Sequence, residues 1–168
     1  GTAATDLRYQ PHRISRGKPG IPGLPAAYAS EEEAETLEID LKDEVTGLLV
    51  TLLYTVFEQL PAIARSVRVK NEGDAPVRLT RADSLALDLP ESRYDLIKLW
   101  GCWAMERTPE RTPLCHGGMR ISSTRGASSH FYNPFAALVS HDATETSGEA
   151  MGFAFVYSGS FQIETEVD

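Results

Sequence analysis

Several features that mark other classes of protein are scarce in this sequence. Its 168 residues include only two cysteines, Cys102 and Cys115, which excludes the disulfide framework of a small secreted domain. Apolar runs are only a few residues long, so the sequence predicts no membrane span. Acidic side chains outnumber basic ones by 24 to 16. The net charge of -8 argues against a nucleic-acid partner, because phosphates are bound by Lys and Arg.

Targeting signals are also missing. Residues 1–4 resemble neither a signal peptide nor a natural start, since they contain no methionine, and no Asn-x-Ser/Thr acceptor occurs. We therefore expect a cytoplasmic protein, and we expect this chain to be a piece of a longer one. The hydrophobic fraction of 42% and the charged fraction of 24% are typical of a globular protein, and the length fits one domain.

Apolar and polar residues alternate with period two along much of the chain. Alternation over 37–42 and a β-rich run over 48–57 flank turn residues, which predicts a hairpin. Residues 65–70 and 77–80 flank an Asn- and Gly-containing turn and predict a second hairpin. Further strand candidates are 85–89, 96–106, 118–125, 136–140, 151–157 and 161–167. Short strands at this spacing predict an all-β sandwich or barrel with little helix.

Two segments lack the strand pattern. Residues 17–25 contain three glycines and three prolines, which predicts an exposed loop that is either a linker or a contact for a ligand or subunit. Residues 108–118 are similarly irregular and predict a second long loop. Ser30, followed by acidic residues, is able to cap a short helical turn, although the pattern from Leu37 onward breaks the helical period. The acids of 31–35 indicate a solvated loop or an approach to an edge strand rather than a functional patch.

No catalytic or phosphate-binding template matches the sequence. The spacing of the possible metal ligands fits no zinc site, so we expect no metal and no cofactor; these ligands are Cys102, Cys115, His116 and His130. Ser129 and His130 are adjacent and would face opposite sides of a strand, so they cannot act as nucleophile and base. The following carboxylates fall in one region and are expected to be solvated: Asp83, Asp88, Glu91 and Asp95.

Aromatic side chains gather near the irregular segments. They are Tyr94, Trp100, Trp103, Phe131, Tyr132 and Phe135. Trp100 and Trp103 differ by an odd number and would face opposite ways on one strand. We expect one of them in the core and the other on the surface, where it is available to a sugar ring or a partner chain.

A series of short motifs is spread along nearly the whole chain, each at its own place in a fixed order. Early ones are Asp6-Leu7-Arg8-Tyr9, Gly17-Lys18-Pro19 and Tyr54-Thr55-Val56-Phe57-Glu58. The most distinctive ones are Tyr94-Asp95-Leu96, Gly101-Cys102-Trp103-Ala104, Gly126-Ala127-Ser128-Ser129-His130 and Asn133-Pro134-Phe135. In this order and spacing they resemble the N-terminal β-sandwich domain of bacterial α-galactosidases of glycoside hydrolase family 36.

The resemblance implies a large antiparallel β-sandwich of the supersandwich type over residues 1–168, which would be a single domain from the N-terminal part of a longer enzyme. It also implies a parent that removes terminal α-galactosyl groups from melibiose, raffinose and related oligosaccharides. In this family two aspartates on a (β/α)₈ barrel act with retention of configuration. Such a barrel takes about 250 residues, so the catalytic barrel is absent from this chain. We expect the fragment alone to be inactive.

Members of the family are often tetramers in which N-terminal domains pack near a neighbour's barrel. The resemblance therefore places substrate-proximal or subunit-interface residues in the aromatic segments; the candidates are Tyr94, Trp103, Arg107, His130 and Asn133. Trp103 would be a flat anchor, and Arg107 and Asn133 would donate hydrogen bonds. Two alternatives to a domain of an α-galactosidase remain open. The chain is then either a free-standing carbohydrate-binding sandwich or a purely structural oligomerisation domain.

Overall fold

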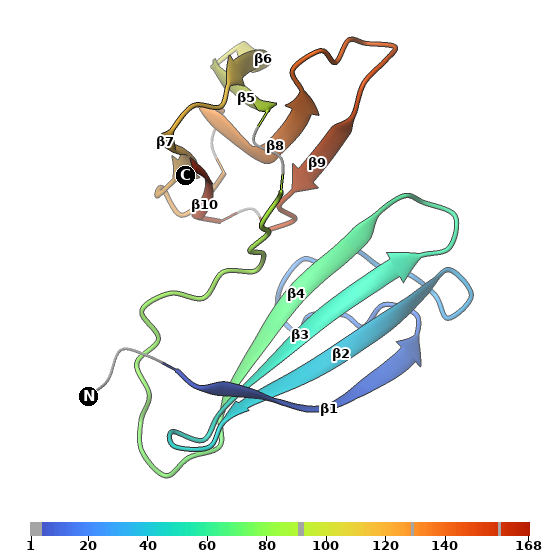
Figure 1. Cartoon of the computed structure of the whole chain (residues 1–168), viewed down its shortest axis with the longest axis vertical. Helices are drawn as coiled ribbons and strands as arrows, with labels where there is room; N and C mark the ends of the chain where they lie inside the picture. Colours follow the sequence, from blue (N-terminus) through green and yellow to red (C-terminus); the bar gives the residue numbers. More distant parts are fainter. Residues whose placement is uncertain (1–4, 91–92, 129, 158) are drawn as a thin grey trace. The chain divides into compact units, whose positions relative to one another are not determined.

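A computed structural model describes residues 5–90, 93–128, 130–157 and 159–168, and it contains β-strands joined by loops and turns (Figure 1). Every pair of neighbouring strands is antiparallel, so the predicted all-β antiparallel class is confirmed. None of the described residues forms a helix long and apolar enough to cross a bilayer. The chain divides into two compact units: Gly1–Gly23 with Ala27–Leu87, and Leu24–Ala26 with Asp88–Asp168. That residues 1–168 form one sandwich domain stays a prediction.

The first unit contains one sheet of order β1-β2-β3-β4. Its strands are β1 (Leu7–Arg16), β2 (Ala34–Asp43), β3 (Leu48–Phe57) and β4 (Ile63–Asn71). The predicted first hairpin is confirmed as β2 and β3. Asp43 closes its turn by accepting hydrogen bonds from the amides of Val45 at 2.9 Å and Thr46 at 3.1 Å.

Period-two alternation divides this sheet into a polar and an apolar face. The register aligns Asp40 with Thr51 and Arg68, and it aligns Arg13 with Glu38 on the same side. These five residues define the polar face. On the other side the register aligns Ile39, Leu52 and Val67, with neighbours that include Ile14, Leu37, Tyr54 and Val69. The sequence predicted the alternation but not which polar residues meet across four strands.

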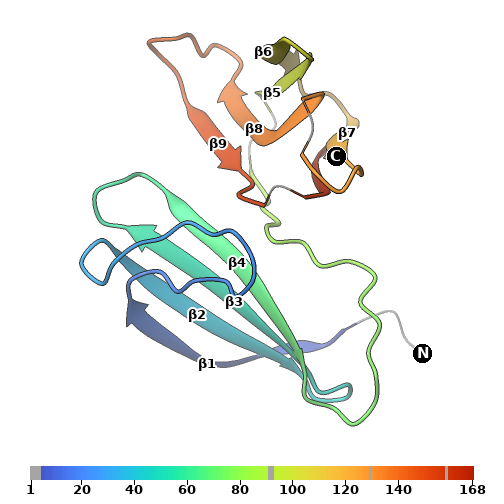
Figure 2. The ribbon, with the colours of Figure 1, turned by 180° about the vertical axis from the view of Figure 1, so that it is seen from behind.

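A loop of residues 17–33 joins β1 to β2 and runs across one face of the sheet, as the blue segment in Figure 2 shows. Gly17, at a φ of 77°, turns the chain, and its amide donates to the Ala34 carbonyl at 2.7 Å. The amide of Lys18 donates to the Ala29 carbonyl at 3.1 Å and closes the loop on itself. The predicted irregular segment 17–25 is therefore confirmed. The acids after Ser30 form a turn rather than a helix.

The second unit contains a four-stranded sheet of order β6-β5-β8-β9 and a pair of strands, β10 and β7. Their bounds are β5 (Tyr94–Cys102), β6 (Met105–Pro113), β7 (Gly117–Ser123), β8 (Tyr132–Ser140), β9 (Ala150–Ala154) and β10 (Phe161–Val167). Side chains from both sets of strands share a core; its buried members are Leu96, Ile121, Ala136, Leu138 and Phe161. This core holds the second unit together through apolar burial.

Several sequence predictions about strands and loops were wrong. The second hairpin does not form, because β4 pairs with β3, and residues 77–80 and 85–89 are irregular. Pro76, Pro90 and the Asn71 turn interrupt this segment, and prolines donate no ladder hydrogen bond. Residues 96–106 are not one strand, because the chain reverses at Trp103 and Ala104, and β6 occupies most of the expected loop 108–118.

Candidate functional site

The turn between β5 and β6 presents a strained and exposed aromatic tip. Cys102 pairs with Met105, so Trp103 and Ala104 form a two-residue connection. Ala104 has a φ of 64° and Arg107 a φ of 61°, in the left-handed region that is costly for residues with a Cβ. The Trp103 side chain is 84% exposed. Such strain persists where the surrounding structure enforces it, and it is concentrated at functional sites.

Gly101 makes this tight reversal possible. A Cβ at this position would overlap the carbonyl oxygen of Met105 and would lie 2.8 Å from the Cα of Glu106. One residue of β5 therefore faces two residues of β6 between the pairs Trp100–Thr108 and Cys102–Met105, which is a β-bulge. The bulge places Arg107 in its positive-φ conformation beside the tip.

The structure brings four of the five predicted site residues to one end of the second sheet. Trp103 and Arg107 lie on the β5–β6 hairpin, while the amide of Gly101 donates to the Phe131 carbonyl at 3.2 Å. His130 and Asn133 flank that contact at the start of β8. Ser129, which the sequence placed next to His130, lies outside the described residues.

Tyr94 does not belong to this group. It pairs with Ser140 at the opposite end of β5, roughly 26 Å along the strand from Cys102. It packs instead against the apolar core of the second unit. The five predicted residues therefore do not form one site, and the binding role of the other four stays a prediction.

Arg125 was not singled out from the sequence, although it lies beside these residues. Its guanidinium carbon is 4.5 Å from the centre of the Phe131 ring, a cation–π distance. The Phe131 ring is in turn 4.6 Å from the His130 ring. The exposed end of the sheet thus combines cationic and aromatic groups. A sequence signal was present only as an arginine close to an aromatic cluster.

Asp95 is a buried anchor, and its predicted solvation is wrong. Its carboxylate accepts a hydrogen bond from Arg111 Nε at 2.6 Å, and its other oxygen lies 2.9 Å from His141 Nδ1. These contacts, His141 first, hold the pKa of Asp95 below its ordinary value. Arg111 also donates to the carbonyls of Ser140, His141 and Ala143, so the cluster fixes the loop between β8 and β9.

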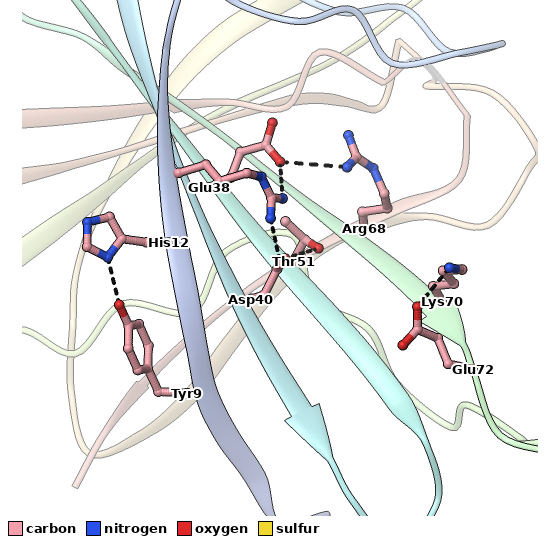
Figure 3. Close-up of polar contacts among 9 residues, drawn as sticks. Tyr9, His12, Glu38, Asp40, Thr51, Arg68, Lys70 and Glu72 are labelled. Atoms are coloured by element: carbon pink, nitrogen blue, oxygen red, sulfur yellow. Dashed lines mark hydrogen bonds and ion pairs between the residues drawn. The ribbon is translucent and has the colours of Figure 1, made fainter.

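The polar face of the first unit carries a second charged network, which the sequence did not predict (Figure 3). Arg13 donates to Asp40 at 2.6 Å and to Glu38 at 2.8 Å. Thr51 donates to Asp40 at 2.6 Å, and Arg68 forms an ion pair with Glu38 at 3.8 Å. The Arg13 hydrogen bond lowers the pKa of Asp40, and the two carboxylates raise that of Arg13. The network spans all four strands.

A hollow of about 390 Å³ lies beside this network, between the 17–33 loop and the sheet. Its lining includes Ser15, Lys18, Tyr28, Ser30, Glu31 and Glu38. Burial lowers the pKa of the Lys18 ammonium group. The Tyr28 side chain is 83% exposed at this hollow. The hollow is open to solvent.

The carboxyl groups with shifted pKa values are held in their ionised form by hydrogen bonds within the fold. A general acid of a glycosidase needs a raised pKa. Hydrogen bonds instead hold the pKa below its ordinary value in Glu33, Asp40, Asp43, Glu72 and Asp95. Within the described ranges no three His, Cys, Asp or Glu side chains are grouped to hold a metal. Both cysteines are free and exposed.

Comparison with known proteins decides the family. The model of the glycosyl hydrolase family 36 N-terminal domain matches residues 1–168. This chain belongs to that family. It is 52% identical to the alpha-galactosidase AgaA of Geobacillus stearothermophilus, covering 100% of this chain and 23% of the relative. The crystal structure of AgaA matches with a TM-score of 0.97 over 100% of this chain and 24% of that chain.

A second relative of this family 36 domain is a longer polypeptide than AgaA. The bifunctional alpha-galactosidase/sucrose kinase AgaSK of Mediterraneibacter gnavus is 45% identical over 100% of this chain and 18% of its own length. The galactosidase domain of AgaSK matches with a TM-score of 0.94 over 98% of this chain and 23% of that chain. The family 36 domain described by this chain thus spans about a quarter or less of the relatives it matches.

Proposed function

We propose that this chain is the non-catalytic N-terminal domain of a bacterial α-galactosidase that hydrolyses terminal α-galactosyl residues in melibiose- and raffinose-type oligosaccharides. The observation that carries this proposal is the 52% identity to AgaA along the entire chain. Structures of AgaA variants contain raffinose and stachyose, which are α-galactoside oligosaccharides.

The domain would support a catalytic barrel of the same polypeptide and take part in a homo-oligomer, with a tetramer as the proposed state. Exposed apolar side chains support such contacts, because large ones seldom gather on the surface of a free monomer. Trp103 is 84% exposed, and Ile14 and Ile63 on the first sheet are 66% and 68% exposed. Free exposed thiols at Cys102 and Cys115 suit the reducing cytoplasm, where we propose the enzyme acts.

The test compares the 168-residue chain with the longer polypeptide that contains it. Both are assayed for galactose release from melibiose and raffinose. We expect release by the longer polypeptide and none by the chain alone. Galactose release by the chain alone would overturn the non-catalytic assignment, and a longer polypeptide without α-galactosidase activity would overturn the assignment of the parent.

A further inference from the structure

The hollow at the 17–33 loop is built from anchored parts. Thr36, which is fully buried, donates to the Gly17 carbonyl at 2.7 Å and shares a hydrogen bond with Thr55 at 2.8 Å. At the other end of the loop, Glu33 accepts hydrogen bonds from the amide and the hydroxyl of Ser30, both at 2.8 Å. One end of the loop is therefore held on the sheet and the other is closed by a local turn, so a ligand would meet a preformed surface rather than one that it must order.

The polar face next to the hollow keeps unused hydrogen-bonding capacity. Both Arg13 and Arg68 approach Oε2 of Glu38, and none of the described residues donates to its Oε1. Arg68 is 57% exposed at its side chain and reaches Glu38 only at 3.8 Å, so its guanidinium donors are available. A polyhydroxylated ligand offers hydroxyls that donate to the carboxylate and accept from the guanidinium.

Tyr28 adds a flat apolar surface at the same hollow. Tyr28 is 83% exposed, and it lines the hollow together with Glu38 of β2. An exposed aromatic ring presents an apolar body and a hydroxyl tip, which suits a ligand that is apolar on one side and polar at its edges. The pyranose rings of sugars have this character.

The charges around the hollow are nearly balanced. Arg16, Lys18, Glu31 and Glu38 line the hollow. Arg13, Arg68 and Asp40 lie on the polar face and contact Glu38 or each other there. A phosphate site gathers cations and a metal site gathers oxygens, so this balance favours a neutral ligand. We propose that the hollow and the polar face bind a neutral oligosaccharide. This proposal goes beyond the proposed function.

The test is a titration of the ¹⁵N-labelled 168-residue chain with raffinose and stachyose, followed by amide NMR. We expect saturable shifts at Gly17, Tyr28, Ser30 and Glu38, with affinity in the millimolar range. Tyr28→Ala and Arg68→Ala should each weaken binding by about threefold to tenfold, as expected for the loss of one ring or one charged donor. Both side chains are exposed, and thermal unfolding checks that the variants remain folded.

The matched control is Tyr9→Ala, because Tyr9 is a second exposed tyrosine of the first unit and does not line the hollow. This variant should bind raffinose with the same affinity as the unsubstituted 168-residue chain. The proposal is overturned if no saturable shift occurs, if shifts gather around Trp103, or if Tyr28→Ala and Arg68→Ala both leave affinity unchanged. Displacement of raffinose by inorganic phosphate would also overturn it. The assay measures no hydrolysis, so its outcome is independent of the α-galactosidase proposal.

Discussion

His141 Nδ1 lies 2.9 Å from one carboxylate oxygen of Asp95, while Arg111 Nε lies 2.6 Å from the other. Asp95 is 4% exposed, so this carboxylate is buried between two partners that come from different strand ends. Arg111 extends the connection to three carbonyl groups of the β8–β9 loop. One buried acid thus organises a loop that is distant from it in the sequence.

Replacing this acid by its amide, Asp95→Asn, should destabilise the chain. The variant removes the charge that satisfies Arg111, and we expect a loss of about 2 kcal/mol in the free energy of unfolding. Urea unfolding measures the change. The control Asp6→Asn removes an exposed partner of Arg8 and should change stability by less than about 0.5 kcal/mol. Equal effects of the two substitutions would contradict the anchoring role.

The same residue predicts a pH dependence. Its folded pKa lies below the ordinary aspartate value of about 3.9, so its stabilising contribution is present above that pH. The contribution is lost as the pH falls through the folded pKa. The stability difference between the unsubstituted chain and Asp95→Asn should therefore be present above about pH 4 and shrink below it. Urea unfolding at several pH values measures it, and a difference that grows as the pH falls below about 4 would contradict the assignment.

The hairpin strain predicts a stabilising substitution. Ala104 has a φ of 64°, which glycine adopts without the steric cost of a Cβ. We expect Ala104→Gly to stabilise the chain by about 1 kcal/mol in urea unfolding. Ala154→Gly, in an ordinary strand position of β9, is the control and should destabilise by about 0.5–1 kcal/mol. A destabilised Ala104→Gly variant would show that the positive φ carries no strain.

The loop over the first sheet depends on one buried hydroxyl. Thr36→Val keeps the shape of the side chain but leaves the Gly17 carbonyl and the Thr55 hydroxyl without this partner. We expect a loss of about 2 kcal/mol, together with faster amide exchange at Gly17 and Lys18. Thr46→Val, at an exposed turn position, is the control for hydrogen exchange in the loop. Unchanged exchange in Thr36→Val would show that the loop is held by other contacts.

Trp103 provides a test of assembly. Because Trp103 is exposed, the Trp103→Ala substitution should change the unfolding free energy of the 168-residue chain by less than about 0.5 kcal/mol. In the longer polypeptide we expect the same substitution to weaken subunit association, which sedimentation measures across a concentration series. Unchanged assembly together with unchanged α-galactosidase turnover would remove Trp103 from the candidate residues.

Local patterns were sufficient to predict much of the secondary structure. The alternation over 37–42 and the run over 48–57 predicted β2 and β3, because one face of each strand is more apolar than the other. The strand candidates at 136–140 and 161–167 fall within β8 and β10. The same reasoning missed the reversal at Trp103, since it depends on positive-φ residues other than glycine, which carry no turn signal in the sequence.

The sequence by itself determined the all-β class, the first hairpin and, through its ordered motifs, the family 36 resemblance. Tertiary structure alone decided that Asp95 is buried, that Tyr94 lies apart from Trp103, and that Arg13, Glu38 and Arg68 meet on one face. The physical reason is that alternation is a property of neighbouring residues. Burial and charge pairing depend instead on the register of strands that are distant in the sequence.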